Sequence, residues 1–565
     1  MPLYQELPDG IDTVDVIIAG GGTAGSIVAA RLSDADPDLS VLLIERGANT
    51  EGDPTISHPA LHIMHIMPNS TRVQFVKANK STALADRELV LPFASVLGGG
   101  SAVNMLMYSR AQRSDLDSWK TPGWSAQDLL GPMRKDAFIN AITQVGWGEV
   151  EDLNDLNTIN GAQRALSYIS PDGKRQDAAT CYLHPRLRDG QHPNLHVLVE
   201  SKVVKVLFDG RRASGILYQS NQGSTLRTVQ ARKMVVLSGG AIGTPLILER
   251  SGVGDPAILK QAGVGVVADI PGVGVGYEDH LNTVVSYKSS LEQSETLDGL
   301  ANKNFDIPAM ITNNDKTLGW NALDVTCKVR PNDADVAVLG SEFQKTWNAE
   351  FKNEPNRPML MMTLIAANAN DPFSVPVGQY FSTSSFVVHP FSRGHVHITG
   401  PELDDPIDFD TGYFSDENDI DLKTCRWAYK KQREIARRMD VYRGEVALFH
   451  PPFAPESKAA CVDVHGPLPG DVADIEYTAE DDVVIDQWLR ENVSTTWHSM
   501  GTCKMLPLEK KGVVDASLGV HGMAGLKVAD LSIAPRNVSA HTNNMALTIG
   551  EKAAEIFIEE LGLGK

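Results

Sequence analysis

The chain has 565 residues, a hydrophobic fraction of 42% and a formal net charge of −20. This length is enough for two hydrophobic cores, or for one large sheet with a second lobe folded over it. The acidic balance argues against nucleic acid and against an anionic membrane as partners, because phosphate groups are bound by basic surfaces. No run approaches the roughly 20 apolar residues that a membrane span requires.

The cysteines and the two ends of the sequence give indications of the cellular compartment in which the protein works. The five cysteines are scattered and form no CxxC pair, so neither a disulfide framework nor a metal site is indicated. The first ten residues, MPLYQELPDG, lack the basic and apolar regions of a secretory signal peptide. The tail LGLGK does not resemble an SKL-type signal. We expect an intracellular protein, cytoplasmic or peroxisomal.

A strand, a glycine-rich turn and a helix are predicted at the start of the chain. Residues 14–19, VDVIIA, are rich in β-branched side chains, as is typical of a buried parallel strand. GGGTAG at 20–25 follows and fits the pattern GxGxxG, and the next residues have helical periodicity. A second apolar strand, VLLIE, ends at Glu45. This order predicts a Rossmann-type unit that binds a dinucleotide.

Each residue of this unit has a physical role. Gly20 permits the tight turn, Gly22 lets the backbone approach a pyrophosphate, and Gly25 lets the helix pack close to the strand. Glu45 can accept hydrogen bonds from ribose hydroxyls, and its charge repels a 2′-phosphate. The predicted cofactor-binding residues are Gly20, Gly22, Thr23, Ala24, Gly25 and Glu45. The motif alone does not distinguish FAD from NAD.

Two further glycine-rich segments carry a family resemblance. Residues 97–104 read LGGGSAVN and residues 240–254 read GAIGTPLILERSGVG. With the amino-terminal unit and the block 495–553, they resemble the glucose–methanol–choline (GMC) oxidoreductase family over nearly the whole chain. The stretches 389–440 and 525–554 look like the fungal alcohol (methanol) oxidase branch. The resemblance implies FAD as the cofactor.

The resemblance also implies where the flavin nucleotide is bound. The residues that match the family's further FAD contacts are Leu97, Gly99, Gly100, Ser101, Asn104, Val203, Asp530, Leu531 and Thr542. Position 103 is Val, where some relatives carry a His that bonds covalently to the flavin, so non-covalent FAD is expected. Ser95 departs from the family, which usually has a basic residue or Asn there.

Two of the 15 histidines stand where the family places its catalytic pair, His498 in TWHSMGTCKM and His541 in VSAHTNNMAL. The resemblance implies that neutral His498 takes the alcohol proton and that His541 hydrogen-bonds the oxygen. Methanol oxidases usually carry Asn at the second position, so His541 is a departure. Met105, Trp497 and Phe93 are predicted to line the substrate pocket. Met105 replaces a Phe of the methanol oxidases and indicates a pocket less closely shaped around a one-carbon alcohol.

Other histidines are interpreted as structural. His395 and His397, in GHVHIT, share one face of a predicted strand, but no third ligand for a metal is evident. His280, in YEDHL, has a position typical of the family and is expected to be structural as well. We therefore predict no metal site.

The expected fold class is α/β for the nucleotide-binding part, and α+β for the chain as a whole. It comprises a Rossmann-type FAD-binding domain and a substrate domain with a mostly antiparallel sheet and flanking helices. The FAD-binding domain is expected at 1–125, 195–285 and 480–565, and the substrate-binding domain at 126–194 and 286–479. Residues 384–391 and 396–399 resemble strands, and 416–439 a long amphipathic helix. The region 140–165 is shorter than in the methanol oxidases, so substrate size cannot be carried over.

The leading interpretation is FAD-dependent oxidation of a primary alcohol to an aldehyde, by hydride transfer to flavin N5. Reoxidation by O₂ would give H₂O₂, so a small-molecule alcohol and O₂ are the expected partners. One alternative is a dehydrogenase that uses a quinone or another acceptor. Others are a lyase or cyclase with structural FAD, and a flavin-binding protein without turnover. A homo-oligomer is left open, because related oxidases often assemble.

Overall fold

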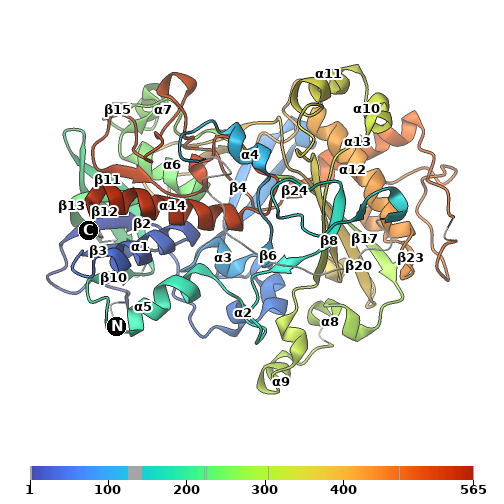
Figure 1. The fold of residues 1–565 in the computed structure, drawn as a ribbon, viewed down its shortest axis with the longest axis horizontal. Helices are drawn as coiled ribbons and strands as arrows, with labels where there is room; N and C mark the ends of the chain where they lie inside the picture. The colour runs from blue at the N-terminus through green and yellow to red at the C-terminus, as the bar shows by residue number, and fades with distance from the viewer. Residues whose placement is uncertain are drawn as a thin grey trace.

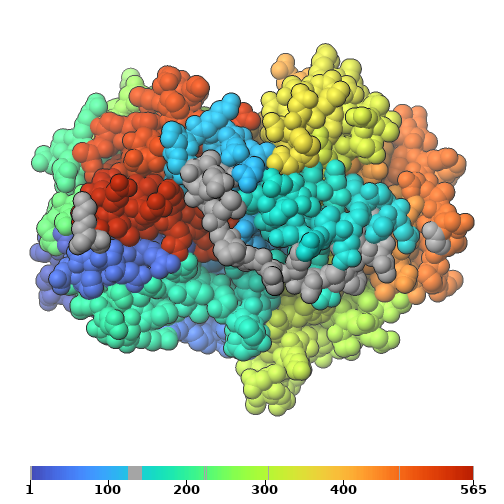
Figure 2. Space-filling view, in the orientation of Figure 1, coloured from blue at the N-terminus to red at the C-terminus, as the bar shows by residue number. Residues whose placement is uncertain are grey.

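The computed structural model describes residues 3–124, 143–221, 223, 225–302, 304–469 and 471–563. Figure 1 shows two lobes side by side, the first containing both ends of the described chain and the second built mainly from the middle of the sequence. In the space-filling view the lobes touch along much of this face, and helix α9 (Ile307–Thr312) protrudes at its lower edge (Figure 2). No helix in these ranges combines the length and the apolar character that a bilayer crossing needs.

The first lobe contains an eight-stranded sheet in the order β1-β10-β3-β2-β13-β12-β11, with β25 paired to β13. The neighbouring strands β1–β10, β10–β3, β3–β2, β2–β13 and β13–β25 pair in parallel. The pairs β13–β12 and β12–β11 are antiparallel. The strands are β1 (Leu3–Tyr4), β2 (Thr13–Ala19), β3 (Val41–Ile44), β10 (Leu195–Leu198), β11 (Ser201–Asp209), β12 (Arg212–Ser220), β13 (Leu226–Leu237) and β25 (Leu526–Val528).

Helices cover the centre of this sheet. Strand β3 and the carboxy-terminal parts of β2 and β13 are apolar there, because both of their faces are buried. Helix α1 (Thr23–Ala35) follows β2 directly and packs against the long carboxy-terminal helix α14 (Asn543–Leu561). The approach is close: a Cβ at Gly550 would lie 3.0 Å from the Ala24 Cα atom. The predicted strand–turn–helix–strand unit and its Rossmann-type sheet are therefore confirmed.

The second lobe contains another eight-stranded sheet, in the order β23-β17-β20-β19-β18-β8-β7, with β24 paired to β17. Every pair is antiparallel except β7–β8, which confirms the mostly antiparallel sheet. The strands are β7 (Gly148–Glu149), β8 (Gly161–Arg164), β17 (Leu281–Ser289), β18 (Leu323–Val329), β19 (Leu360–Ile365), β20 (Tyr380–Val387), β23 (Tyr442–Glu445) and β24 (Ser494–Thr495).

Helix α12 (Ile420–Arg437) packs on β20 and β17, and α13 (Ala479–Asn492) packs on α12. Helix α12 begins four residues later than predicted, since Asp416 Oδ2 accepts a hydrogen bond from the Ile420 backbone and Asp419 is left-handed at φ 53°. The strand predicted at 384–391 is part of β20, which ends before Pro390, a residue without the N–H that a ladder requires.

The strand predicted at 396–399 lies in a separate three-stranded sheet. This sheet has the order β16-β21-β22 and consists of β16 (Val275–Tyr277), β21 (Gly394–Ile398) and β22 (Ile407–Asp410).

The domain division given above remains our proposal. Strand β17 begins at Leu281 and pairs with β24, so the second sheet takes residues from both sides of the proposed boundaries. Residues 125–142, where the substrate domain was expected to begin, lie outside the described ranges.

Candidate active site

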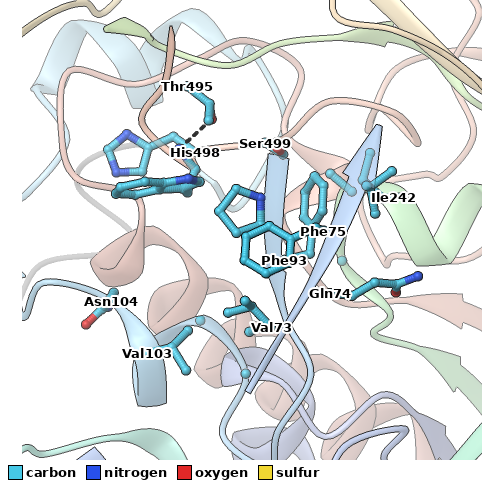
Figure 3. Close-up of a pocket in the computed structure, with 18 of the residues that line it drawn as sticks. Val73, Gln74, Phe75, Phe93, Val103, Asn104, Ile242, Thr495, His498 and Ser499 are labelled. Atoms are coloured by element: carbon cyan, nitrogen blue, oxygen red, sulfur yellow. Dashed lines mark hydrogen bonds between the residues drawn. The ribbon is translucent and has the colours of Figure 1, made fainter. Parts of the chain in front are cut away.

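A cavity of about 1270 Å³ lies where the two lobes meet. Its walls include the turn after β2, the hairpin of β4 (Val73–Ser81) and β5 (Arg87–Ala94), and the start of α14. Figure 3 shows Phe75 and Phe93 of this hairpin in the centre of the view, His498 above and to the left, and Val103 and Asn104 below and to the left, all lining this cavity. The cavity therefore joins the predicted nucleotide loop to the predicted catalytic residues.

The turn after β2 requires glycine at the predicted positions. Gly20 has φ 119°, and a Cβ there would lie 2.2 Å from the Ser238 carbonyl oxygen. Gly25 packs against that turn, because a Cβ on it would lie 2.1 Å from the Gly20 carbonyl oxygen. Gly20, Gly22, Thr23 and Ala24 line the cavity, whereas Gly25 lies behind its wall.

The second glycine-rich segment lies directly against the first. The Gly98 N–H donates to the Gly21 carbonyl at 2.8 Å, and a Cβ on Gly99 would lie 2.6 Å from the Gly22 Cα atom. Of the predicted residues in this segment, Gly99, Gly100 and Asn104 line the cavity.

Leu97 and Ser101 do not line the cavity. Leu97 is buried in the hydrophobic core of the first lobe. The Ser101 hydroxyl donates to the Gly98 carbonyl at 2.7 Å and accepts from the Ala178 N–H at 2.9 Å. These two residues therefore support the loop on the side that faces away from the cavity.

Glu45 lies at the end of β3, and its carboxylate is fixed by the glycine-rich turn. Oε2 accepts from the Gly21 N–H at 2.9 Å and Oε1 from the Gly47 N–H at 2.8 Å. Burial raises the pKa of this carboxyl. Glu45 lines the cavity together with Val203 of β11, so both are available to a nucleotide.

Asp530 joins the cavity wall to helix α6 (Gly240–Arg250). Its Oδ2 accepts from the Gly240 N–H at 2.9 Å and from the Thr244 hydroxyl at 2.6 Å, and burial raises its pKa. Leu531 and Thr542 line the same part of the cavity. The structure thus brings the amino-terminal glycine-rich turn and the carboxy-terminal segment around Asp530 to one cavity.

This lining fits a flavin dinucleotide. Helix α1 begins after Gly22 with no side-chain cap and no acidic residue in its first turn, so its first N–H groups can meet phosphate. Because Gly99 has no Cβ, its segment packs directly against Gly22, and together the two turns form a cradle of backbone. Gly22, Thr23, Gly99 and Asn104 are the residues we expect at the phosphates and flavin.

His498 and His541 lie next to each other in the cavity wall, in edge-to-face contact. Their ring centroids are 5.4 Å apart with planes at 77°. His498 is buried, whereas His541 is partly buried with its Nε2 atom enclosed. Burial lowers the pKa of His498 well below its ordinary value, and lowers that of His541 to about 4, with Lys328 adding to the second shift. Both imidazoles are therefore neutral at pH 7.

A buried aspartate organises the loop that carries His498. Asp279 Oδ1 accepts from the backbone N–H groups of His280 and His498, at 2.8 and 3.0 Å. Its Oδ2 accepts from the hydroxyls of Thr495 and Tyr413. The Nδ1 atoms of His280 and His498 lie 2.8 Å apart, so His280 orients the His498 ring.

His541 is held by its backbone instead. Its N–H donates to the Ser109 hydroxyl at 2.7 Å, and its Nε2 is buried without a hydrogen-bond partner among the described residues. An unpaired polar atom in a cavity wall is costly unless a ligand satisfies it. The structure therefore leaves one imidazole nitrogen of His541 for a bound molecule.

The three predicted pocket residues, Met105, Trp497 and Phe93, all line the cavity. Trp497 is 38% exposed and has a left-handed backbone, φ 61°, which its N–H bond to the Thr495 hydroxyl (2.7 Å) holds. Phe386 of β20 adds an apolar wall between the two histidines.

Sequence reasoning did not identify Asp279 and Phe386, and it treated His280 only as structural. The adjacency of Asp279 and His280 in YEDHL was a usable signal. Nothing in the β20 sequence YFSTSSFV distinguishes Phe386 from an ordinary core residue.

Comparison with known proteins gives a consistent result. Residues 14–136 and 132–282 match the amino-terminal family profile described as GMC oxidoreductase, and residues 390–550 match the carboxy-terminal one. The chain is 34% identical to "Alcohol oxidase" of Candida boidinii, over 97% of this chain and 95% of that protein. It is 28% identical to "Alcohol dehydrogenase [acceptor]" of Pseudomonas putida, over 97% and 96% respectively.

A solved structure of similar fold is formate oxidase from Aspergillus oryzae RIB40. It superposes with a TM-score of 0.81 at 20% identity, over 98% of this chain and 99% of that one. At this identity the likeness concerns the fold alone.

Proposed function

Because this chain belongs to the GMC oxidoreductase family, for which FAD is the expected cofactor, we propose that it is an FAD-dependent alcohol oxidase. The reaction proposed is oxidation of a primary alcohol to an aldehyde, with reduction of O₂ to H₂O₂. One observation carries this proposal. Two neutral histidines in contact, His498 and His541, line one cavity that also begins at the Gly20–Gly25 loop.

His498 is the proposed base for the alcohol proton. Its Nδ1 is engaged with His280, which leaves Nε2 as the ring nitrogen for a substrate hydroxyl. Nε2 can accept a proton only if Nδ1 carries the hydrogen, so His498 must donate in this bond and His280 must accept. A neutral base in a buried site is ready for this role at pH 7.

His541 is the proposed partner of the alcohol oxygen. Its unpaired Nε2 can donate a hydrogen bond to the oxygen as negative charge develops there. When bound, FAD supplies the acceptor for the hydride that leaves the carbinol carbon. Val103 lines the cavity where some relatives attach the flavin through His, and we accordingly propose non-covalent binding.

The walls near the two histidines are largely apolar. Phe93, Met105 and Trp497 line the cavity, and the Phe386 ring lies within 5.6 Å of both imidazole centroids. Such walls favour an alcohol with a hydrocarbon or aromatic body, because each methylene removed from water contributes about 0.8 kcal/mol. The similarity to named alcohol oxidases supports the same class of substrate.

The test is an anaerobic panel of alcohols, from methanol to long-chain and aryl alcohols, read by bleaching of the flavin absorbance. We expect primary alcohols to bleach the flavin, and admission of air to restore it with one H₂O₂ per turnover. Bleaching followed by slow reoxidation that a quinone accelerates would instead identify a dehydrogenase, which the similarity to the bacterial acceptor-dependent enzyme favours as the second candidate. A flavin that no alcohol bleaches would overturn both.

A further inference from the structure

A second cavity, of about 700 Å³, shares no lining residue with the candidate active site. It lies where strands β16, β21 and β22 meet the segment 504–511. Its lining is basic, although the chain as a whole has a net charge of −20. The basic and imidazole side chains that line it are Arg393, His395, His397, Lys504, Lys510 and Lys511. This concentration of positive charge needs an explanation.

The permanent cations of this cavity are only partly neutralised. Arg393 Nε and Lys504 Nζ share a single carboxylate oxygen, Oε1 of buried Glu278, at 3.2 and 2.6 Å. Lys510 and Lys511 are exposed, and neither has an ion-pair partner in the part of the chain that the structure describes. One carboxylate therefore faces two cations, with two further cations beside them.

The acidic groups next to the imidazoles do not cancel this excess. Asp408, which lines the cavity, lies 3.2 Å from His395 Nε2 and also accepts from the Asn79 amide. Buried Glu249 lies 2.6 Å from His397 Nδ1. Each of these carboxylates faces its own histidine. Together with Glu278, three carboxylates oppose the four permanent cations, which leaves one positive charge in excess.

The two histidines do not form a metal site. Their rings stack at 5.2 Å, and within the described residues no group of three His, Cys, Asp or Glu side chains is arranged to hold a metal ion. The lysines and arginine around them would repel a metal cation. The same arrangement attracts an anion.

The backbone is shaped to bring these cations together. Gly276 of β16 has φ 80°, and a Cβ there would lie 3.0 Å from Lys504 Cε. Glycine at this position lets the Lys504 side chain cross the strand and reach Glu278. Lysine and arginine are the side chains that bind phosphate oxygens, the first as a point charge and the second as a planar fork.

We propose that this basic cavity binds a phosphate-type oxyanion, free or carried on a small molecule. Arg393 and Lys504 form its fixed inner part, and Lys510 and Lys511 close over the ligand from the exposed side. This site is separate from the dinucleotide loop, and its existence does not depend on the oxidase activity proposed above.

The experiment uses the flavin-loaded protein, whose own phosphate site is filled, with inorganic phosphate as the probe. Isothermal titration calorimetry and thermal unfolding are compared in phosphate and in chloride at equal ionic strength. We expect phosphate to bind and to raise the unfolding temperature beyond the chloride value, because a ligand that binds only the folded state stabilises it. Equal behaviour in the two salts would overturn the proposal.

Two double variants locate the effect. Lys510→Ala with Lys511→Ala should weaken phosphate binding about tenfold, since it removes two exposed ion pairs with the ligand. Lys316→Ala with Lys352→Ala removes the same charge from exposed positions in the other lobe and should leave binding unchanged. Lys510→Arg with Lys511→Arg should retain it. If both alanine pairs bind phosphate like the native protein, the anion lies elsewhere and the assignment is wrong.

Discussion

His280 and His498 are joined through their Nδ1 atoms, 2.8 Å apart, with their rings perpendicular and 4.9 Å between centroids. His280 also stacks on Phe386 at 5.1 Å, and the same phenyl ring contacts His498 and His541. This hydrogen bond and this aromatic side chain help to position the two proposed catalytic imidazoles, together with the backbone bonds of His498 to Asp279 and of His541 to Ser109.

Replacing His280 by Ala should lower kcat by about 10- to 100-fold, the range typical of partners that orient a functional histidine. KM should change little, because His280 contacts His498 rather than the cavity interior. His280→Gln supplies an amide oxygen that can accept from Nδ1 and should recover part of the loss. Steady-state kinetics across pH test this: equal loss in both variants with an unchanged pH profile would indicate a packing role only.

Replacing His498 by Ala should reduce the rate of flavin bleaching by alcohol about 10²- to 10⁴-fold, the contribution typical of a general base. Flavin content should stay close to that of the native protein, because His498 lies in the carboxy-terminal loop and not in the glycine-rich cradle. His465 is exposed, and His465→Ala is the matched control. Stopped-flow absorbance under nitrogen measures the rate of flavin bleaching in both variants. Bleaching in His498→Ala at the native rate would exclude this residue as the base.

Buried neutral histidines should make the folded state sensitive to acid. The folded pKa of His541, about 4, lies below the ordinary 6.5, so the unfolded chain binds more protons between these values. Its contribution to stability is full above pH 6.5 and is lost as pH falls toward 4, up to about 3 kcal/mol.

His541→Asn should therefore flatten the fall of unfolding free energy between pH 6.5 and 4.5. The control His465→Asn, at an exposed position, should follow the native curve. Denaturant unfolding at several pH values gives the slopes. A native-like slope in His541→Asn would show that this imidazole is not the buried neutral group inferred from the structure.

Gly99→Ala should abolish stable FAD binding. Gly99 has φ 56°, and its Cβ would lie 2.6 Å from the Gly22 Cα atom, so the two glycine-rich segments would be forced apart. Gly466→Ala meets no atom within 4 Å and serves as control. The ratio of flavin to protein absorbance after gel filtration is the measurement, and full flavin retention in Gly99→Ala would contradict the proposed cradle.

The amino-terminal unit could be predicted because its signals are local. A β-branched strand, three glycines with fixed spacing and a helix lie within about 20 residues, and each feature follows from the backbone conformation that it requires. Helix and strand boundaries were less accurate. Capping of α12 by Asp416 and the end of β20 before Pro390 depend on contacts and donors that periodicity does not register.

Among the site residues, the sequence could assign a segment but not the direction of each side chain. Gly99 and Asn104 reach the cavity, whereas Leu97 and Ser101, in the same eight residues, turn into the core and the loop. The direction of each side chain depends on the left-handed backbone at Gly98 and Gly99, and on the core residues and loop groups that pack behind this segment.

The sequence by itself determined the family and the nucleotide-binding unit and predicted the two histidines, since these are carried by residue type and spacing along the chain. Only the tertiary structure decided how those histidines are held. His280 and His498 are 218 positions apart, and Phe386 comes from a third segment, so their contact exists only after two sheets have packed together. Burial in that packed interior also sets their neutral state, because desolvation is a property of the folded surroundings and of no single residue.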